Sequence, residues 1–520
     1  MLHILSGRYL TGSMGDEIGL IPLSFPPISN IRLIYHQIQL FRNYDSQIYI
    51  SISLPKSYSL LERDFQMLST RNVDIIWVED GLSQKEELLY VLENIVSYKL
   101  QNDLWLLQGD TLPVDLPHEE NLIAVEWSDL ENEMYVEEYG VEKNLIYCGM
   151  YRFSDILFLK KCLHANSNNN FYAAIKQYSL HIVTPKSVLS PVHYLGSVAG
   201  YYKARSAITS ERAFNTLDVK NIVLSKFSSN IAKITAESNW FEKIPTSMKH
   251  YMPQYISSQV KNSKYSYSIE YLPCLPLNEL YVYGRQTIIF WNKIFTKFIQ
   301  YFSDAQKVYK KSGMKGVDSF ALNKKLFIDK TLERVEQFSI DCSFDLTAEN
   351  TFCSETLPSV NQIIEETSKH VLTMKNIIGF LHGDLCFSNI LYDSRSESIK
   401  LIDPRGIDNS GSEMLYGSII YDVAKLSHSV IGLYDYIISD QYELSGDKHV
   451  FNFEIFLPQG VEEIQALFFE RLPISNINSK DIYAINILLF LSMLPLHYDD
   501  PKRQRALLAN ALRLYKKAFF

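Results

Sequence analysis

Short apolar runs alternate with amphipathic stretches from the start of the chain to about residue 205. Between them, residues 27–41 and 84–100 place apolar side chains at helical spacing. Four runs of strand type lie at residues 46–53, 73–80, 103–110 and 121–127. Alternating strands and helices of this kind predict an α/β layer with a largely parallel sheet.

The pattern changes near residue 210, where we expect a domain boundary. Residues 212–275 carry shorter runs of β type, interrupted by one helical stretch at 232–244. From residue 280 onward the chain is predicted to be mainly helical, apart from two paired short strands at 389–393 and 399–403. The predicted division is a first domain, residues 1–210, followed by a small lobe, residues 211–278, and a large lobe, residues 279–520.

Two polar segments, residues 164–170 and 341–355, are predicted to be surface loops. The longest nearly apolar run, residues 483–496, is too short to span a bilayer and predicts a buried helix. The N-terminus lacks the charged start, apolar core and cleavage site of a secretory signal. We therefore expect a cytoplasmic protein without an integral membrane segment.

Composition narrows the possible partners. The 520 residues are 47% apolar and 21% charged, which is typical of soluble globular domains. A net charge of −9 provides no overall basic field, so nucleic acid is not an expected partner. The six cysteines form no C-x-x-C pair, which argues against a disulfide framework or a zinc site. No motif specifies an oligomeric state.

The strongest chemical signal is the segment FLHGDLCFSNILYD, residues 380–393. His382, Asp384 and Asn389 have the H-x-D-x-x-x-x-N spacing of a kinase catalytic loop, in which the aspartate accepts or orients the acceptor's hydroxyl proton. Asp403 ends the next strand-like run, IKLID, after one short hairpin. An amide and a carboxylate at one end of a hairpin are suitable oxygen ligands for the Mg²⁺ of Mg·ATP.

These residues resemble the aminoglycoside phosphotransferase and choline kinase family, whose signature is H-G-D-x-x-x-x-N followed by a strand ending in I-D. The resemblance covers about residues 212–520 and implies a bilobal, protein-kinase-like α+β fold. It also implies that Asp384 is the catalytic base and that Asn389 and Asp403 bind magnesium. Asp422, in YDVAKL, would have a structural role in a helix beyond the site.

The small lobe of that family carries a lysine for the ATP phosphates and a helix glutamate that pairs with it. Lys226 ends an apolar β-type run and is our preferred lysine, with Glu237 as its partner; Lys233 is the alternative. The segment IEYLP would then be the hinge, with Glu270 and Leu272 at the adenine. No G-x-G-x-x-G loop is present, so the loop that covers the phosphates is unassigned.

A second resemblance concerns residues 1 to about 205. The segments LWLLQGDTLP and IYCGMYRFS resemble strands of the doubly wound sugar-phosphate nucleotidyltransferases, which implies that Asp110 binds a metal at the nucleotide. The family's phosphate-binding lysine is replaced by Ile21, and its second metal aspartate by Tyr194. The first domain is therefore expected to be degenerate. The cations that could line a phosphate pocket are Arg8, Lys186, Lys203 and Arg205.

Together, the two resemblances imply a small-molecule kinase that phosphorylates a hydroxyl of a sugar or amino alcohol, as in capsule or surface polysaccharide biosynthesis. One alternative is a bifunctional kinase–nucleotidyltransferase, and another is a non-catalytic nucleotide-binding scaffold. The acceptor pocket is expected in the helical C-terminal region. Its candidate residues, near a helix junction, are His497, Asp499, Asp500 and Arg503.

Overall fold

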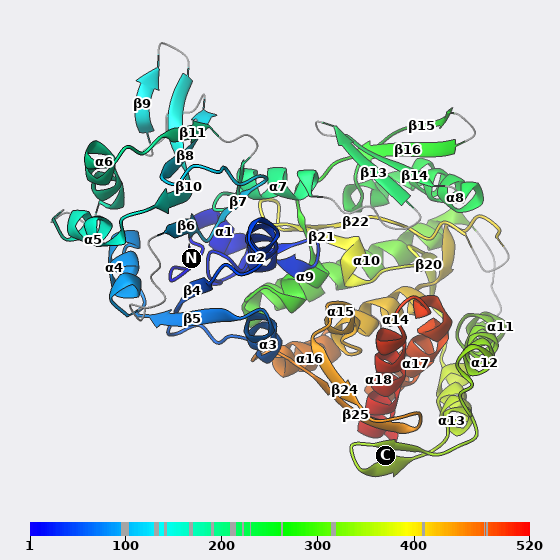
Figure 1. The fold of residues 1–520 in the computed structure, drawn as a ribbon. Coiled ribbons are helices and arrows are strands. Elements are labelled where there is room, and N and C mark those ends of the chain that lie inside the picture. The colour runs from blue at the N-terminus through cyan, green and yellow to red at the C-terminus, as the bar shows by residue number, and fades with distance from the viewer. Residues whose placement is uncertain are drawn as a thin grey trace. The chain divides into compact units, whose positions relative to one another are not determined.

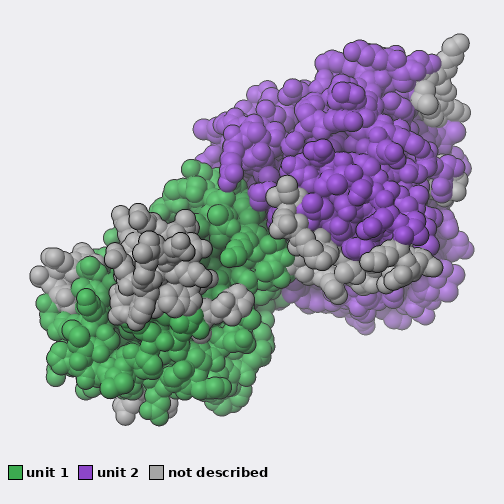
Figure 2. All heavy atoms as spheres, turned by 90° about the horizontal axis from the view of Figure 1, so that it is seen from above, with its two compact units in different colours: residues 1–210, 283–285 green, residues 211–282, 286–520 purple. Residues whose placement is uncertain are grey.

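The computed structural model describes residues 1–94, 103–128, 135–139, 143–165, 170–188, 192–208, 215–220, 223–228, 230–261, 264–313, 319–407, 411–472, 474 and 477–520. The chain divides into two compact units, coloured separately in Figure 2: unit 1 is residues 1–210 with 283–285, and unit 2 is residues 211–282 with 286–520. The predicted boundary near residue 210 lies outside the described residues, as do residues 95–100 of the predicted helix 84–100 and residues 166–169 of the predicted loop 164–170.

Unit 1 is built on a mixed sheet with the order β11–β8–β10–β6–β1–β4–β5, and β9 pairs with β10 (Figure 1). Strand β1 runs parallel to both β4 and β6, whereas β10 runs antiparallel to β6 and β8. The strands are β1 (Leu2–Leu5), β4 (Ile50–Pro55), β5 (Val73–Val78), β6 (Leu104–Gln108), β8 (Leu122–Ser128), β9 (Tyr135–Tyr139), β10 (Lys143–Phe153) and β11 (Lys186–Val188).

The central strands β1, β4 and β6 are buried at every position, as expected for strands covered on both faces. Helices α4 (Gln84–Asn94), α5 (Ile156–Ala165) and α6 (Phe171–His181) contribute apolar side chains to one core with this sheet. The other elements of unit 1 are α1 (Gly12–Ile18), β2 (Pro27–Ile28), β3 (Ile31–Arg32), α2 (Leu33–Tyr44), α3 (Glu62–Thr70), β7 (Thr111–Pro113), β12 (Val192–Tyr194) and α7 (Val198–Ala207). The predicted α/β class is confirmed.

Unit 2 begins with a small antiparallel sheet in the order β13–β14–β16–β15. Its strands are β13 (Asn215–Lys220), β14 (Val223–Ser228), β15 (Tyr255–Lys261) and β16 (Lys264–Glu270). Helix α8 (Ile231–Glu242) packs on this sheet through its buried face, which includes Ile234 and Phe241. The side chain of Asn230 caps the helix by accepting a hydrogen bond from the backbone N–H of Lys233 at 3.1 Å. This sheet and its helix lie within the segment predicted to be rich in β structure, residues 212–275.

The rest of unit 2 is mainly helical around α17 (Ser479–Met493), which packs against α12, α13, α14 and α18 (Figure 1). Among the described residues, 479–497 are the single helical stretch long and apolar enough to cross a membrane, but 78% of that window is buried inside the protein. The other helices are η1 (Thr246–Tyr251), α9 (Leu277–Val282), α10 (Ile288–Ser312), α11 (Ser319–Asn323), η2 (Lys324–Asp329), α12 (Lys330–Cys342), α13 (Val360–Thr373), η3 (Phe387–Asn389), α14 (Ile419–Val430), α15 (Tyr434–Ile438), α16 (Val461–Glu470), η4 (Leu494–His497) and α18 (Pro501–Phe519).

Short strands complete unit 2. The predicted hairpin is present as β21 (Ile390–Asp393) and β22 (Ser398–Leu401), with β17 (Leu275–Pro276) beside β21. Strand β20 (Ile378–Phe380) pairs with β23 (Tyr416–Ser418). The small sheet followed by a mainly helical part confirms the predicted α+β class.

One further sheet in the helical part was not predicted. Its order is β19–β18–β25–β24, and its strands are β18 (Asn350–Phe352), β19 (Glu355–Leu357), β24 (Tyr442–Ser445) and β25 (Val450–Ile455). The prediction of a surface loop over residues 341–355 is therefore wrong at both ends. Residues 341–342 belong to α12, and Asn350 and Phe352 are buried in β18. Strand β18 pairs with β25 from a distant part of the sequence, so its own three residues carry too little pattern to identify it.

Candidate functional site

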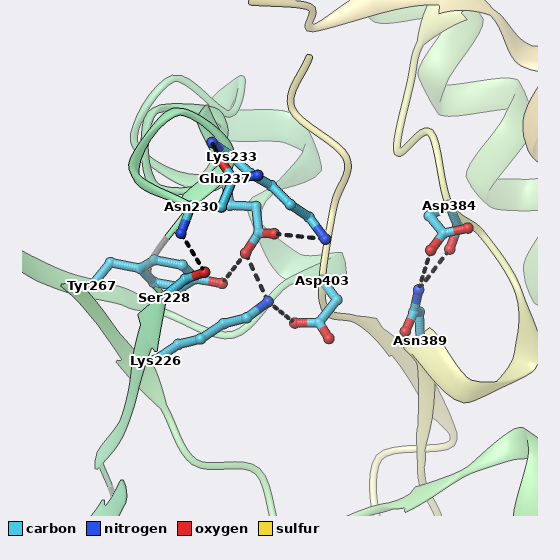
Figure 3. A network of polar contacts seen from close by, with 9 residues as sticks. All are labelled: Lys226, Ser228, Asn230, Lys233, Glu237, Tyr267, Asp384, Asn389 and Asp403. Atoms are coloured by element: carbon cyan, nitrogen blue, oxygen red, sulfur yellow. Dashed lines mark hydrogen bonds and ion pairs between the residues drawn. The ribbon is translucent and has the colours of Figure 1, made fainter. Parts of the chain in front are cut away.

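A buried lysine forms the centre of a polar network in unit 2 (Figure 3). Lys226, on β14, places its Nζ 2.7 Å from Glu237 Oε2 on α8 and 3.0 Å from Asp403 Oδ1. The hydroxyl of Tyr267 also donates to Glu237 Oε2, at 3.1 Å. Since Lys226 and Glu237 are 4% and 3% exposed, their charges need this pairing to offset the cost of burial.

The pKa shifts in this network follow from burial and pairing. Burial alone would lower the pKa of Lys226, but the carboxylates of Asp403 and Glu237 raise it above its ordinary value, so the lysine stays charged. Burial raises the pKa of Glu237 against the opposing effect of Lys226. Lys233, the alternative lysine, has a 55% exposed side chain, with its Nζ 3.9 Å from Glu237 Oε1. The geometry therefore favours Lys226 over Lys233.

The predicted catalytic loop is held by a buried carboxylate. Asp422, on α14, accepts hydrogen bonds from the backbone N–H groups of His382 at 2.8 Å and Gly383 at 2.7 Å. Burial raises the pKa of Asp422 to about 7 although both bonds oppose the shift. Gly383 has φ +82°, and a Cβ there would lie 2.8 Å from that of Arg405. The structural role expected for Asp422 is thus to fix the backbone on which Asp384 sits.

His382 links the loop to the strand that precedes Asp403. Its Nδ1 accepts from the backbone N–H of Asp384 at 3.3 Å, so the proton of the neutral ring is on Nε2, 3.0 Å from the carbonyl oxygen of Ile402. Burial lowers the pKa of His382 to about 4, which keeps the ring neutral at physiological pH. His382 therefore connects two backbone segments of the site. Both of its ring nitrogens are engaged by backbone groups, so the ring has no free proton to exchange with substrate.

Asp384 is the partly exposed carboxylate of the site. Its side chain is 40% exposed, and its Oδ1 lies 2.9 Å from Lys425 Nζ on α14. The Asn389 amide donates to Asp384 Oδ2 at 3.2 Å (Figure 3). Desolvation by the surrounding chain would raise the pKa of Asp384, but the Lys425 ammonium holds it below its ordinary value. The carboxylate is therefore ionised at neutral pH and able to accept a proton.

Lys425 was missed by the sequence analysis, which assigned YDVAKL only a structural role. The available signal was its position three residues after Asp422, because residues three apart on a helix share a face. Asp422 and Lys425 thus reach the same loop from one side of α14, and the first fixes its backbone while the second pairs with its carboxylate.

Asn389 and Asp403 flank the same end of the β21–β22 hairpin. The backbone N–H of Ile402 donates to the carbonyl of Asn389 at 3.0 Å, which places Asp403 one residue from that contact. Asp403 has φ +55°, a left-handed conformation that is uncommon outside glycine and is found at functional sites. One carboxylate and one amide oxygen suit Mg²⁺ when nucleotide phosphates and water complete its octahedral coordination.

The predicted hinge residues lie where β16 leaves the small sheet. Glu270 ends β16, and its side chain accepts from the backbone N–H of Gln254 at 3.2 Å. Leu272 follows in the segment before β17, and its carbonyl accepts from the backbone N–H of Cys274 at 2.8 Å. These bonds shape the connection between the small sheet and the helical part.

Two of the candidate acceptor residues have a structural role. Asp500 caps α18 by accepting from the backbone N–H of Arg503 at 3.0 Å, and its carboxylate also pairs with the Arg503 guanidinium at 3.1 Å. Arg503 lies 3.8 Å from Asp499 as well. Burial lowers the pKa of His497, whose ring lies 6.3 Å from that of Tyr434.

In unit 1, Asp110 lies in the turn between β6 and β7 and is 6% exposed. Tyr194, on β12, is brought beside it because β12 pairs with β7, and the backbone N–H of Leu195 donates to the carbonyl of Asp110 at 2.7 Å. The Tyr194 side chain is hydrogen-bonded to the Asp110 carboxyl. Burial raises the pKa of Asp110, and Arg8 and Tyr194 oppose that shift. The Tyr194 hydroxyl therefore lies at the position where the nucleotidyltransferase pattern implies a second carboxylate that binds metal.

A second buried carboxylate in unit 1, Glu87 on α4, was not predicted. It accepts from the backbone N–H of Gly7 at 2.7 Å and from the hydroxyl of Ser53, and it lies 3.7 Å from Arg8 Nε. Burial raises the pKa of Glu87, and Arg8 is among the groups that lower it. The same guanidinium therefore compensates two buried acids, Asp110 and Glu87. A glutamate on the apolar face of the predicted helix 84–100 was the available signal.

The remaining predicted cations of unit 1 lie on β11 and α7. Arg205 is engaged elsewhere, since its guanidinium packs over the ring of Tyr201 and donates to the Tyr201 hydroxyl at 3.2 Å. Lys186 and Lys203 are exposed on β11 and α7. Ile21 is fully buried, so no charge replaces the lysine of the nucleotidyltransferase pattern at that position.

Comparison with known proteins gives matches in solved structures alone. No protein-family model matches the sequence, and no curated protein matches it. HddC from Yersinia pseudotuberculosis is 18% identical, with a TM-score of 0.28, and the match covers 40% of this chain and 99% of that one. A thermostable mutant of the aminoglycoside phosphotransferase APH(4)-Ia, in complex with ADP and hygromycin B, is 12% identical with a TM-score of 0.39. That match covers 60% of this chain and 93% of the other.

A putative fructosamine-3-kinase from Haemophilus somnus is 11% identical with a TM-score of 0.33, and the match covers 58% of this chain and 92% of that one. Proteins of both predicted types, phosphotransferase and nucleotidyltransferase, are therefore among the similar structures. Because the sequence identities and TM-scores are low, we assign the fold of each unit from the order and direction of its own strands and helices.

Proposed function

We propose that unit 2 is an ATP-dependent phosphotransferase that phosphorylates a hydroxyl group of a small molecule. The observation that carries the proposal is the grouping of Asp384, Asn389 and Asp403 with the buried Lys226–Glu237 pair. These groups come from separate elements, and together they supply a base, oxygen ligands for a metal, and a cation for phosphates. A purely structural network would not require an ionised, 40% exposed carboxylate next to an amide ligand.

In the proposed reaction, the acceptor's hydroxyl oxygen forms a bond to the γ-phosphorus of ATP while the bond to the β,γ-bridging oxygen breaks. ADP leaves with that electron pair, and the hydroxyl proton passes to Asp384. Lys425 keeps Asp384 ionised until the proton arrives, and the Asn389 amide fixes the orientation of the carboxylate.

Lys226 is assigned to the α- and β-phosphates, with Glu237 holding its ammonium in place. Asn389 and Asp403 would hold Mg²⁺, which neutralises phosphate charge when it is bound. Asp403, which pairs with Lys226 in this structure, would also be a ligand of that metal. The backbone between Glu270 and Leu272 is assigned to the adenine.

For unit 1 we propose a nucleotide- or sugar-phosphate-binding domain without turnover. Arg8 already compensates Asp110 and Glu87, and the Tyr194 hydroxyl occupies the side of Asp110 where a second carboxylate would be needed. The role we propose for the whole protein is phosphorylation of a precursor for capsule or surface polysaccharide biosynthesis. A bifunctional kinase–nucleotidyltransferase is the alternative.

The test is a melting scan of the full chain with ATP, with and without magnesium. Ligand that binds only the folded state raises the Tm as its concentration rises. We expect a magnesium-dependent rise that is lost in Asp403→Ala and kept in Asp447→Ala, a matched variant of an exposed aspartate. ADP release with a panel of sugars and amino alcohols then identifies the acceptor. Absence of any Tm shift at millimolar Mg·ATP would refute the proposal.

A further inference from the structure

Four cationic side chains surround one buried tyrosine in unit 2. Tyr421 on α14 is 4% exposed, and Lys330 Nζ on α12 lies 3.4 Å from its hydroxyl. The guanidinium of Arg405, which follows β22, lies 6.0 Å from the Tyr421 ring centroid. Arg334 is one turn after Lys330 on α12, and Lys425 is one turn after Tyr421 on α14, so each pair shares a helix face. We call Lys330, Arg334, Arg405 and Lys425 the cationic cluster.

The members of the cationic cluster differ in their compensating negative charge. Lys425 pairs with Asp384, but neither Lys330 nor Arg334 forms an ion pair with a carboxylate in the part of the chain that the structure describes. The Arg334 guanidinium donates a hydrogen bond to the carbonyl oxygen of Ser492 at 3.0 Å. Like charges held together destabilise one another, so two neighbouring cations without a carboxylate partner, here Lys330 and Arg334, are typical of a site that receives an anion.

The charges act on one another, which supports this interpretation. Burial lowers the pKa of Lys330, and Arg334, Arg405 and Lys425 lower it further. Burial would raise the pKa of Tyr421, yet Lys330, Lys425 and Arg405 bring it below its ordinary value. The four cations therefore produce a positive potential at one place, and the Tyr421 ring lies in it.

The cationic cluster adjoins the proposed catalytic base. Lys425 belongs to the cluster and also contacts Asp384 at 2.9 Å, and Asp384 is exposed enough to meet a hydroxyl. We infer that the acceptor alcohol carries an anionic group, a phosphate or a carboxylate, that Lys330 and Arg334 bind while its hydroxyl lies at Asp384. This inference rests on the proposed function and specifies its acceptor class.

The first experiment compares related acceptors with and without an anionic group. ADP release is measured with glycerol, glycerol 3-phosphate and glycerate, and with glucose, glucose 6-phosphate, glucuronate and glucosamine. We expect an anionic member to exceed its neutral partner in kcat/KM by about tenfold or more, the effect of one charged hydrogen bond. Comparing the phosphate compounds with the carboxylate compounds shows which of the two anionic groups the site prefers. A preference for neutral or cationic acceptors would overturn the inference.

The second experiment removes the charges. Lys330→Met and Arg334→Met should each raise KM for the preferred anionic acceptor about tenfold or more while leaving KM for ATP unchanged. Lys325→Met, at an exposed lysine of the neighbouring η2 turn, is the control and should change neither constant. A parallel rise in KM for ATP would assign the cationic cluster to the nucleotide phosphates and contradict the inference.

Failure of the proposed function can be separated from failure of the inference. If no compound supports ADP release, the phosphotransferase proposal fails, and calorimetry with glycerol 3-phosphate and glucose 6-phosphate still tests the cationic cluster. Binding that is absent for glycerol and glucose and weakened in Lys330→Met supports an anion site. Absence of binding by every anionic compound would reject it.

Discussion

Lys425→Met is the variant that tests the charge pairing at the base. The substitution removes the ammonium that lies 2.9 Å from Asp384 Oδ1 and keeps an apolar chain of similar length on α14. Two unit charges at that distance attract by roughly 1.4–6 kcal/mol for effective dielectric constants of about 80 to 20. Because Asp384 is 40% exposed, solvent screening favours the lower half of that range, about 1.5–3 kcal/mol.

Loss of that attraction raises the pKa of Asp384, because the neighbouring cation no longer favours the ionised form. Lys425 holds this pKa below its ordinary value in the parent protein, so the base stays ionised as the pH falls well into the acid range. In Lys425→Met the Asp384 carboxylate becomes protonated at a higher pH. The protonated form cannot accept the proton of the acceptor's hydroxyl group. The acid limb of the pH–rate profile should therefore move to higher pH.

The assay is kcat/KM for ADP release between pH 4.5 and 9. Lys425→Arg, which keeps the positive charge, should retain most of the parent profile and serves as the control. Melting scans establish that both variants are folded. An unchanged acid limb in folded Lys425→Met would refute the reasoning that this ion pair sets the ionisation of the base.

Three further variants test other parts of the argument. Asp384→Asn should keep the magnesium-dependent Tm shift with ATP but lower kcat by about 100-fold or more, since an amide cannot accept the proton; near-parent turnover in this variant would place the base elsewhere. In the full chain carrying Asp384→Asn, we expect no pyrophosphate release from CTP, UTP, GTP or ATP with sugar or alcohol phosphates; release that disappears on adding Asp110→Ala would make the protein bifunctional. His3, fully buried in β1, has its pKa lowered to about 3 by burial, so the folded state binds fewer protons than the unfolded state and stability should fall as the pH drops below 6.5. His3→Gln should reduce that loss of Tm between pH 6.5 and 5, and an identical pH dependence in both proteins would contradict the assignment.

The sequence by itself determined the features whose pattern is local. Asp384 and Asn389 lie within one loop, and Asp403 follows one hairpin, so their spacing directly limits how far apart they can lie. Likewise, strand–helix alternation in residues 1–205 and the β-rich segment before residue 275 predicted the two fold classes, because hydrophobic periodicity reports which face of each element is buried.

Tertiary structure decided the features that join distant residues. Strand β18 exists because β25, from a distant part of the sequence, pairs with it. Glu87 becomes buried beside Gly7 only when α4 packs on β1. In the helical part, α12, α14 and the segment after β22 bring Lys330, Lys425 and Arg405 around Tyr421. A side chain's burial and charged neighbours depend on which elements pack together, and packing energy is shared among residues far apart in the sequence, so no single segment records it.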